Sequence, residues 1–351
     1  MIRGKKFLSS MLTALVITVT LSAVSVQAAA TVSRTDGGSG GRIGTANKVA
    51  ADLFGKAKNV ILVNGYGYPD AVSATPLAKL LGAPILLTAG GDTLESEVAA
   101  TIQNLGATNI YIVGGKGVVS TSIEKTLKNK YTVERIAGVN DTTRMGTNAE
   151  VAKKVLSLSG QKSAVLVNGQ DGYADALSVA SIAAQKGYPV LFGTSQMIYS
   201  TVKDVITSNG LSILAVGGEG VLPQSVVDTV SGKKITNNAT DRFATNLAVL
   251  DYFKNNGGLD FGTVYIAAGG ATNDQFADAL VASAAASKTG SPLVLTGVGA
   301  SETQAQAAQN YINVNATDSS KLIIIGGTAS VSQEIQSSLS TGDALKIIEI
   351  E

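Results

Sequence analysis

The chain has 351 residues, of which 45% are hydrophobic and 15% charged, and 27 Lys and Arg nearly balance 26 Asp and Glu. This length suits about two or three ordinary domains, and the composition argues against disorder and against binding polyanions by bulk charge. Histidine and cysteine are absent, which excludes disulfides, thiol chemistry, a Ser/His/Asp triad and zinc sites built on histidine.

The N-terminal segment has the pattern of an export signal. Arg3, Lys5 and Lys6 form a positive start, residues 8–26 are apolar apart from Ser and Thr, and small residues follow. We expect residues 1–28 to be a cleaved signal peptide, after which 24 basic residues face 26 acidic ones. An uncleaved anchor is the alternative, but this Ser- and Thr-rich stretch would make a weak spanning helix. We therefore expect no membrane contact after cleavage.

Residues 29–41 are rich in Gly and Ser and show no apolar periodicity, so we expect a linker there. Beyond it, one pattern of strand, Gly turn, helix, proline and second strand occurs three times. Its Asp-Ala pair begins at Asp70, Asp175 and Asp278, and a proline follows each Asp by 14 positions. Because this period is that of a whole small domain, we predict three domains, at residues 42–136, 137–235 and 236–351.

Strands and helices alternate within each repeat. In the first, helical spacing from Arg42 precedes a strand at 60–63, and helices at 70–81, 95–105 and 120–127 separate further strands at 85–87, 110–113 and 131–136. The second repeat retraces this order, and the third ends on a closing strand at 346–350. Continuous apolar strands joined through helices by short links predict a parallel sheet covered by helices on both faces.

Three further motifs accompany the repeats. An Arg/Gly/Asp/Arg cluster is clearest from Arg135 to Arg144, with poorer copies from Lys234 to Arg242 and from Arg34 to Arg42. A Pro-Ile-Leu-Leu strand and a Val-Gly-Gly turn recur. With these motifs and the Asp-Ala-Leu-Ser core, the chain resembles the clostridial cell-wall-binding repeat 2 family over about residues 34–351.

The resemblance implies three tandem Rossmann-like or Toprim-like α/β domains, each a four-stranded parallel sheet in the order 2-1-3-4, arranged about a pseudo-threefold axis. It also implies an exported, non-catalytic protein that attaches non-covalently to an anionic secondary polysaccharide of the Gram-positive wall. We expect no cofactor, metal or nucleic-acid partner, with other surface proteins as further partners. A secreted solute-binding or adhesive α/β repeat protein is the alternative. A nucleotide enzyme is disfavoured because G-x-G-x-x-G and P-loop motifs are absent.

The basic candidates for ligand binding are four arginines. Arg42, Arg144 and Arg242 each stand three residues before a threonine. Each could pair with a helix end or an acid at a domain joint, or could hold a phosphate or carboxylate in its guanidinium fork. Arg135, which opens the clearest cluster, completes the set.

The other candidates are acidic or apolar. Asp70, Asp175 and Asp278 could cap helices, accept bonds from sugar hydroxyls, or hold the arginine of a neighbouring repeat, which we favour. The strand Ile85, Leu86 and Leu87 is expected in the core, and the family resemblance makes it a second-line ligand candidate. Glycine turns at 114, 217 and 326 should lie at the carboxyl ends of strands, a usual place for ligands.

Overall fold

The computed structural model describes residues 30–236, 239–272 and 275–342. The expected signal peptide and the closing strand predicted at 346–350 lie outside these ranges. Within them, every helix is too short or too polar to cross a lipid bilayer.

Each repeat alternates strands and helices as predicted. The first contains β2 (Asn59–Asn64), β3 (Ile85–Thr88), β4 (Asn109–Val113), β5 (Thr132–Ile136), α1 (Gly41–Val49, continued by a π-helical turn at Ala50–Phe54), α2 (Tyr68–Leu81), α3 (Ser96–Leu105) and α4 (Thr121–Lys128). The second contains β6 (Ser163–Asn168), β7 (Val190–Gly193), β8 (Ser212–Ala215), β9 (Lys233–Lys234), α5 (Arg144–Ser159), α6 (Tyr173–Lys186), α7 (Ser200–Asn209) and α8 (Gln224–Asp228). The third contains β10 (Thr263–Ala268), β11 (Leu293–Thr296), β12 (Lys321–Ile325), α9 (Arg242–Gly257), α10 (Ala277–Thr289), α11 (Glu302–Asn315) and α12 (Gln333–Thr341).

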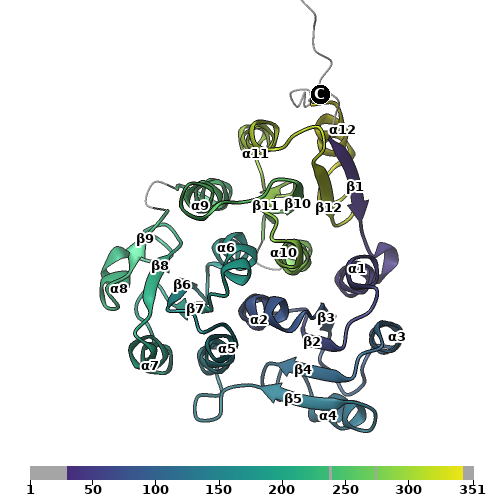
Figure 1. Cartoon of the computed structure of the whole chain (residues 1–351), viewed down its shortest axis with the longest axis vertical. Helices are drawn as coiled ribbons and strands as arrows, with labels where there is room; N and C mark the ends of the chain where they lie inside the picture. Colours follow the sequence, from purple (N-terminus) through teal and green to yellow (C-terminus); the bar gives the residue numbers. More distant parts are fainter. Residues whose placement is uncertain (1–29, 237–238, 273–274, 343–351) are drawn as a thin grey trace, which may run out of the picture.

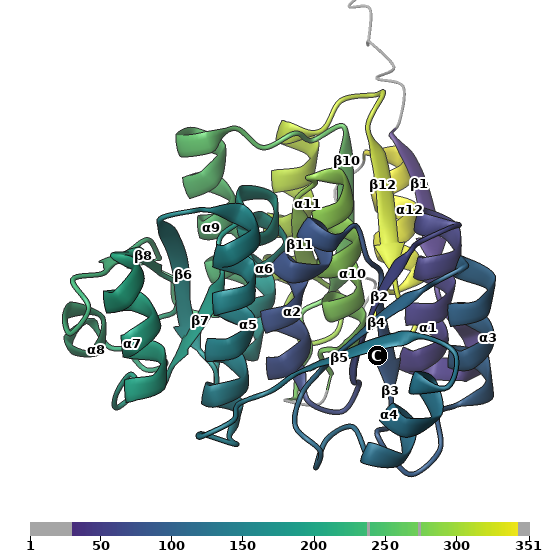
Figure 2. The same cartoon turned by 60° about the horizontal axis from the view of Figure 1, so that its bottom comes forward.

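The three sheets have one topology. Their strand orders are β3-β2-β4-β5, β7-β6-β8-β9 and β11-β10-β12-β1, where β1 is Thr31–Thr35, with parallel pairing throughout. In the first two repeats this is the predicted order 2-1-3-4, and in the third sheet the repeat itself supplies the strands of the order 2-1-3, with the strand from residues 31–35 in fourth place. The predicted fold, three parallel four-stranded α/β units, is confirmed, and Figure 2 shows the second sheet, with β6, β7 and β8, at the left of the molecule, away from the other two.

The fourth strand of the third sheet comes from the start of the chain. Strand β1 (Thr31–Thr35), in the segment that we expected to be a linker, pairs with β12 over its whole length. Arg34 fixes this pairing, because its guanidinium donates to Gln336 and to the carbonyls of Gly326 and Val331. The linker expectation was therefore wrong for these residues. The sequence of β1 shows little apolar alternation because the strand lies half-buried at the edge of the sheet. Backbone hydrogen bonds and the Arg34 side chain hold it there.

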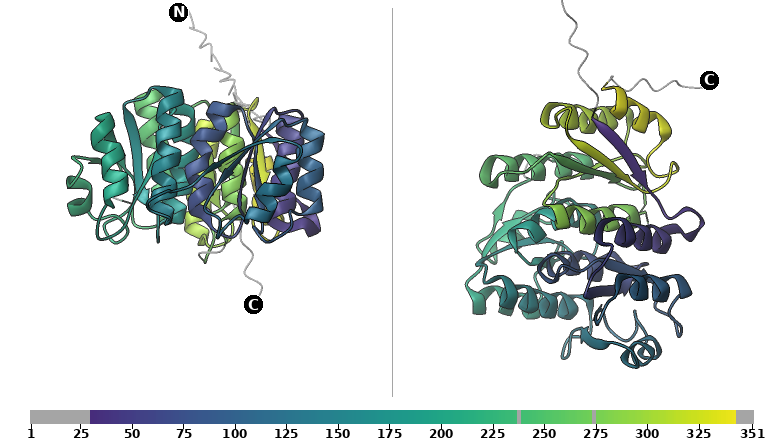
Figure 3. Two further views of the ribbon diagram at one scale, coloured as in Figure 1. Left: turned by 90° about the horizontal axis from the view of Figure 1, so that it is seen from below. Right: turned by 45° about the vertical axis from the view of Figure 1, so that its right-hand side comes forward.

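The three repeats close around a common axis. Helices α2, α6 and α10 pack on one another at the centre of the molecule, and the sheets lie around them (Figure 1). At the start of these helices the rings of Tyr68, Tyr173 and Phe276 form a triangle, with centroids 5.9, 5.9 and 6.3 Å apart. In side view the helices stand side by side across a flat body (Figure 3). The predicted pseudo-threefold arrangement is confirmed.

The first helix of each repeat forms the joint to the repeat before it. Helix α5 packs on α2, α9 on α6, and α1 on α10, so the third repeat contacts the first. The buried side chain of Asn148 in α5 bonds the backbone of β7 at Val190 and Phe192 and reaches across the joint to Ser73. Asn246 in α9 bonds β11 in the same way. These asparagines fasten the first helix to the edge strand of its own sheet.

Candidate functional site

A groove opens at each of the three joints, and each combines an aspartate of one repeat with an arginine and a threonine of the next. The first groove, between repeats 1 and 2, contains Asp70, Arg144 and Thr147 and has a volume of about 360 Å³. The second, between repeats 2 and 3, contains Asp175, Arg242 and Thr245 and measures about 290 Å³. The third, between repeats 3 and 1, contains Asp278, Arg42 and Thr45 and measures about 660 Å³.

The glycine turn after the third strand of each sheet forms the wall opposite the arginine. Gly326, with a φ of +111°, lies so close to Asp278 that an added Cβ would stand 2.2 Å from its carboxylate oxygen. The same contact would be 2.7 Å for Gly114 with Asp70 and 3.2 Å for Gly217 with Asp175. Glycine is required here because the backbone has a positive φ and the carboxylate passes directly beside it. The grooves therefore lie at the carboxyl ends of the strands, as predicted for these turns.

The three aspartates lie inside the first turn of the central helices and do not cap them. The cap positions are Gly67, Gly172 and Phe276, so helix formation starts earlier than we expected and the capping alternative was wrong. Burial raises the pKa of Asp70 and of Asp175 to about 6, while the charges of Arg144 and Arg242 oppose the rise. The positive charge of the following repeat's arginine thus acts on each aspartate, and the role that we favoured, holding that arginine, stays a prediction.

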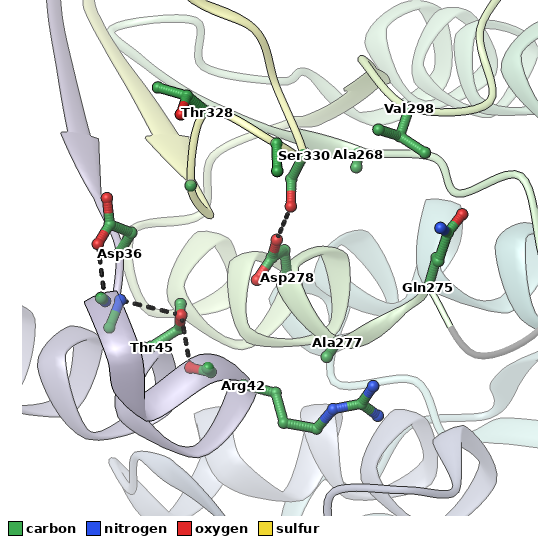
Figure 4. A pocket seen from close by; sticks show the side chains of 15 residues that line it. Asp36, Arg42, Thr45, Ala268, Gln275, Ala277, Asp278, Val298, Thr328 and Ser330 are labelled. Carbon is green, nitrogen blue, oxygen red and sulfur yellow. Dashed lines mark hydrogen bonds between the residues drawn. The ribbon is translucent and has the colours of Figure 1, made fainter.

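Asp278 lies beside the glycine turn of the third groove (Figure 4). Ser330 donates to its carboxylate at 2.6 Å. Burial raises its pKa, which the Ser330 bond and the Arg42 charge oppose. Asp36 lies at the other end of this cavity, and the guanidinium of Arg42 is turned away from Asp278 (Figure 4).

The three groove arginines are held by the backbone of their own repeats. Arg42 donates to the carbonyl of Gly65 at 2.8 Å, Arg144 to Gly169 at 3.1 Å and Arg242 to Gly269 at 3.2 Å. These glycines directly follow the first strand of each sheet. Arg242 also contacts the hydroxyl of Tyr173 across the joint. Because a guanidinium carries five N–H donors, the bond from Arg144 to the Gly169 carbonyl orients its group and leaves donors for a ligand.

Arg135 has a different environment from the groove arginines. Its guanidinium donates to Glu124 at 2.7 Å and to the carbonyls of Gly114 at 2.8 Å and Ser120 at 3.3 Å, all within the first repeat. Its side chain is 11% exposed and lines none of the three grooves. Arg34 and Lys234 occupy the corresponding places in the other two sheets. This position braces the glycine turn that forms the groove wall.

Ile85, Leu86 and Leu87 lie in the core as expected. Leu86 and Leu87 are fully buried, Ile85 nearly so, and none of them lines a groove. Their predicted contact with a ligand would require an exposure that the described structure does not give them.

Sequence reasoning missed two features of the site. One is the pair Asn148 and Asn246, which follow the groove threonines directly and could have been found from their repetition. The other is Tyr66, an exposed ring in the first groove that has no counterpart in the other repeats and so gave no repeat signal. Over the described ranges, no group of three or more acidic side chains is placed to hold a metal ion.

Three tandem α/β repeats closed about an axis, with an open polar groove at each joint, define a repeat protein with three related candidate binding sites. A family model for cell wall binding domain 2 matches residues 37–124, 135–227 and 238–336, and the chain belongs to this family. Cell-wall binding, with association to the wall or cell surface, is therefore the role of these three domains.

The relatives agree with this assignment. The chain is 32% identical over 305 residues to N-acetylmuramoyl-L-alanine amidase LytC of Bacillus subtilis, covering 86% of this chain and 57% of that protein. It is 29% identical over 301 residues to the Amidase enhancer of Bacillus subtilis, covering 85% and 39%. The chain thus spans about half the length of these relatives, or less.

Two solved structures share the fold. Cwp8 from Clostridium difficile has a TM-score of 0.73 at 29% identity, covering 88% of this chain and 51% of that chain. Cwp6 from Clostridium difficile has a TM-score of 0.76 at 23% identity, covering 90% and 48%, and this likeness concerns the fold.

Proposed function

We propose that this protein is exported and attaches without catalysis to an anionic polysaccharide of the cell wall, through the three grooves at its joints. The observation that carries the proposal is that a buried or half-buried aspartate and an arginine of the next repeat line the same groove at all three joints. The arginine supplies donors for a phosphate or carboxylate, and the glycine turn supplies backbone groups for sugar hydroxyls.

Repetition supplies the affinity in this proposal. An exposed ion pair contributes only about 0–1 kcal/mol, so one groove alone would bind weakly. Three grooves that engage one polymer chain raise the overall avidity by roughly 10²–10⁴, provided that the polymer spans them. The central rings of Tyr68, Tyr173 and Phe276 keep the three grooves in fixed relation, which preserves this gain.

A catalytic role has less support from the residues. The chain contains no histidine or cysteine, so a zinc site or general base of the usual kind would have to be built from carboxylates alone. The relatives named as an amidase and an amidase enhancer match this chain over 57% and 39% of their lengths. We therefore propose a binding function for the part that is shared, with other surface proteins as further partners.

Sedimentation with purified walls tests the proposal. The protein without residues 1–28 is mixed with sacculi that keep their anionic polymer and with sacculi stripped of it by hydrofluoric acid. We expect it to pellet with the first and not the second, and to be released by the free polymer. Equal pelleting with both would overturn the anionic-polymer proposal. No pelleting at all, together with saturable binding of a small solute, would favour the solute-binding alternative.

A further inference from the structure

The three grooves differ in charge, although they share one plan. Among the described lining residues, the first groove has one acid, Asp70, and one base, Arg144, and is formally neutral. The third groove has Asp36 and Asp278 against Arg42. The second groove has Asp171, Asp175, Glu219 and Asp241 against Arg242, and Lys234 behind the wall pairs with Glu219, so three acids still face one base. An anionic polymer is therefore repelled least by the first groove and most by the second.

The first groove also contains an exposed aromatic ring. Tyr66 is 62% exposed, while large aromatic side chains usually bury their surface. The corresponding residues of the other repeats, each directly after the glycine that accepts the arginine bond, are Gln170 and Gly270. The ring is thus specific to the first repeat, and the fold does not require it.

The turn that carries Tyr66 is fixed by hydrogen bonds. The backbone N–H of Tyr66 donates to the side chain of Asn64 at 2.7 Å, and that side chain donates to the carbonyl of Val118 at 2.7 Å. Val118 is itself part of the groove wall. These bonds tie the turn after β2 to the turn after β4, so the ring is presented on a rigid support.

One face of the ring is already occupied by a cation. The guanidinium carbon of Arg42 lies 4.7 Å from the ring centroid, a cation–π contact that holds the ring in place. Arg42 lines the third groove while Tyr66 lines the first. The ring therefore lies where the linings of the first and third grooves meet.

We propose that the first groove is the principal polymer site and that the open face of Tyr66 stacks on a sugar ring there, beside the charged group held by Arg144. This inference rests on the proposed wall-polysaccharide function. An aromatic face suits the apolar C–H face of a pyranose, and a neutral groove admits the neighbouring anion. Tyr66 thus selects for the sugar part of the polymer, and Arg144 for its charge.

Anionic polysaccharide released from purified walls serves as the probe. Y66A and Y66Q should weaken its binding by roughly three- to tenfold, whereas Y66F should stay within about twofold of wild type. Y199A removes another exposed tyrosine, which lies outside the grooves, and should bind as wild type does. Among single arginine variants, R144A should lose the most affinity.

The absence of tryptophan from the chain gives a direct reporter. In Y66W the only indole stands at the proposed stacking site, and its emission should shift to shorter wavelength on adding the polysaccharide but not inorganic phosphate. Unchanged emission at saturating polysaccharide, or wild-type affinity of Y66A, would overturn the role of Tyr66. Loss in R242A equal to that in R144A would overturn the ranking of the grooves. Either result leaves the proposed function standing, whereas failure of wild type to bind the polysaccharide would refute the proposed function itself.

Discussion

Arg144 of the second repeat and Asp70 of the first face one groove from opposite sides of a domain joint, and the arginine charge opposes the rise that burial causes in the pKa of the aspartate. The same relation joins Arg242 to Asp175 and Arg42 to Asp278. Each groove therefore exists only when two repeats are docked. Ligand binding therefore depends on the docking of the three repeats, because a separated repeat would contain only half of each groove.

The buried aspartates make stability depend on pH in a defined direction. Burial raises the pKa of Asp175 from 3.8 to about 6 in the folded protein, so the folded state binds more protons than the unfolded state between about pH 4 and pH 6. The contribution of this group to stability is then fully present below about pH 4 and is lost as the pH rises through about 6. We expect D175N to be more stable than wild type at pH 7, by roughly 1–3 kcal/mol.

Denaturant unfolding of wild type and D175N at several pH values checks this. The difference in unfolding free energy between the two proteins should grow from pH 4 to pH 7. This trend is that of a raised pKa, because groups with lowered pKa values, such as Glu124 and Asp241, act in the opposite direction. A difference in unfolding free energy that does not vary with pH would contradict the raised pKa of Asp175.

The buried asparagine that follows the groove threonine should stabilise the fold, and the first repeat, which lacks it, provides an internal comparison. Asn148 is buried and makes hydrogen bonds to Val190, Phe192 and Ser73. In the first repeat Ala46 occupies the corresponding place, and the side chain of Asn47 is buried without a hydrogen-bond partner among the described residues. We expect N148A to destabilise the protein by roughly 2–4 kcal/mol and N47A by much less. Thermal unfolding measures both, and equal losses would show that the edge-strand bonds contribute little.

Arg34 should stabilise the pairing of β1 with the third sheet. Removing its side chain leaves the carbonyls of Gly326 and Val331 and the side chain of Gln336 without this donor. We expect R34A to lose roughly 2–4 kcal/mol of unfolding free energy and to speed hydrogen exchange in β12. R144A, whose guanidinium makes one backbone bond at 3.1 Å, is the matched control and should cost about 1 kcal/mol or less. Unchanged exchange in β12 of R34A would argue against this role.

Most of the fold could be predicted from the sequence because the three repeats can be compared with one another. A proline at fixed distance from each Asp-Ala pair and the continuous apolar strands located the central helices and the inner strands within a few residues. Strand β1 escaped prediction because its partner, β12, is nearly 300 residues away, and no local pattern reports a contact of that range. Tyr66 escaped because comparison among repeats finds only what is repeated.

The site was predicted in part for the same reason. The repeated arginines and aspartates, which we selected because they recur in each repeat, line the same grooves at the joints. Arg135 carried an equally good motif, yet its guanidinium is used within its own repeat by Glu124 and two carbonyls. A motif alone does not distinguish an arginine that builds a groove wall from one that faces the groove. That distinction depends on which acceptors the fold places around it.

The most direct test of the groove account is the salt dependence of wall binding in a variant with Arg42, Arg144 and Arg242 all replaced by alanine. Exposed ionic contacts weaken as salt screens them, so wild type should bind polymer-bearing walls tightly at low ionic strength and progressively less at higher salt. The folded triple variant should bind at least tenfold more weakly, with a shallower salt dependence. If it binds as tightly as wild type with the same salt dependence, the groove arginines are not the attachment site.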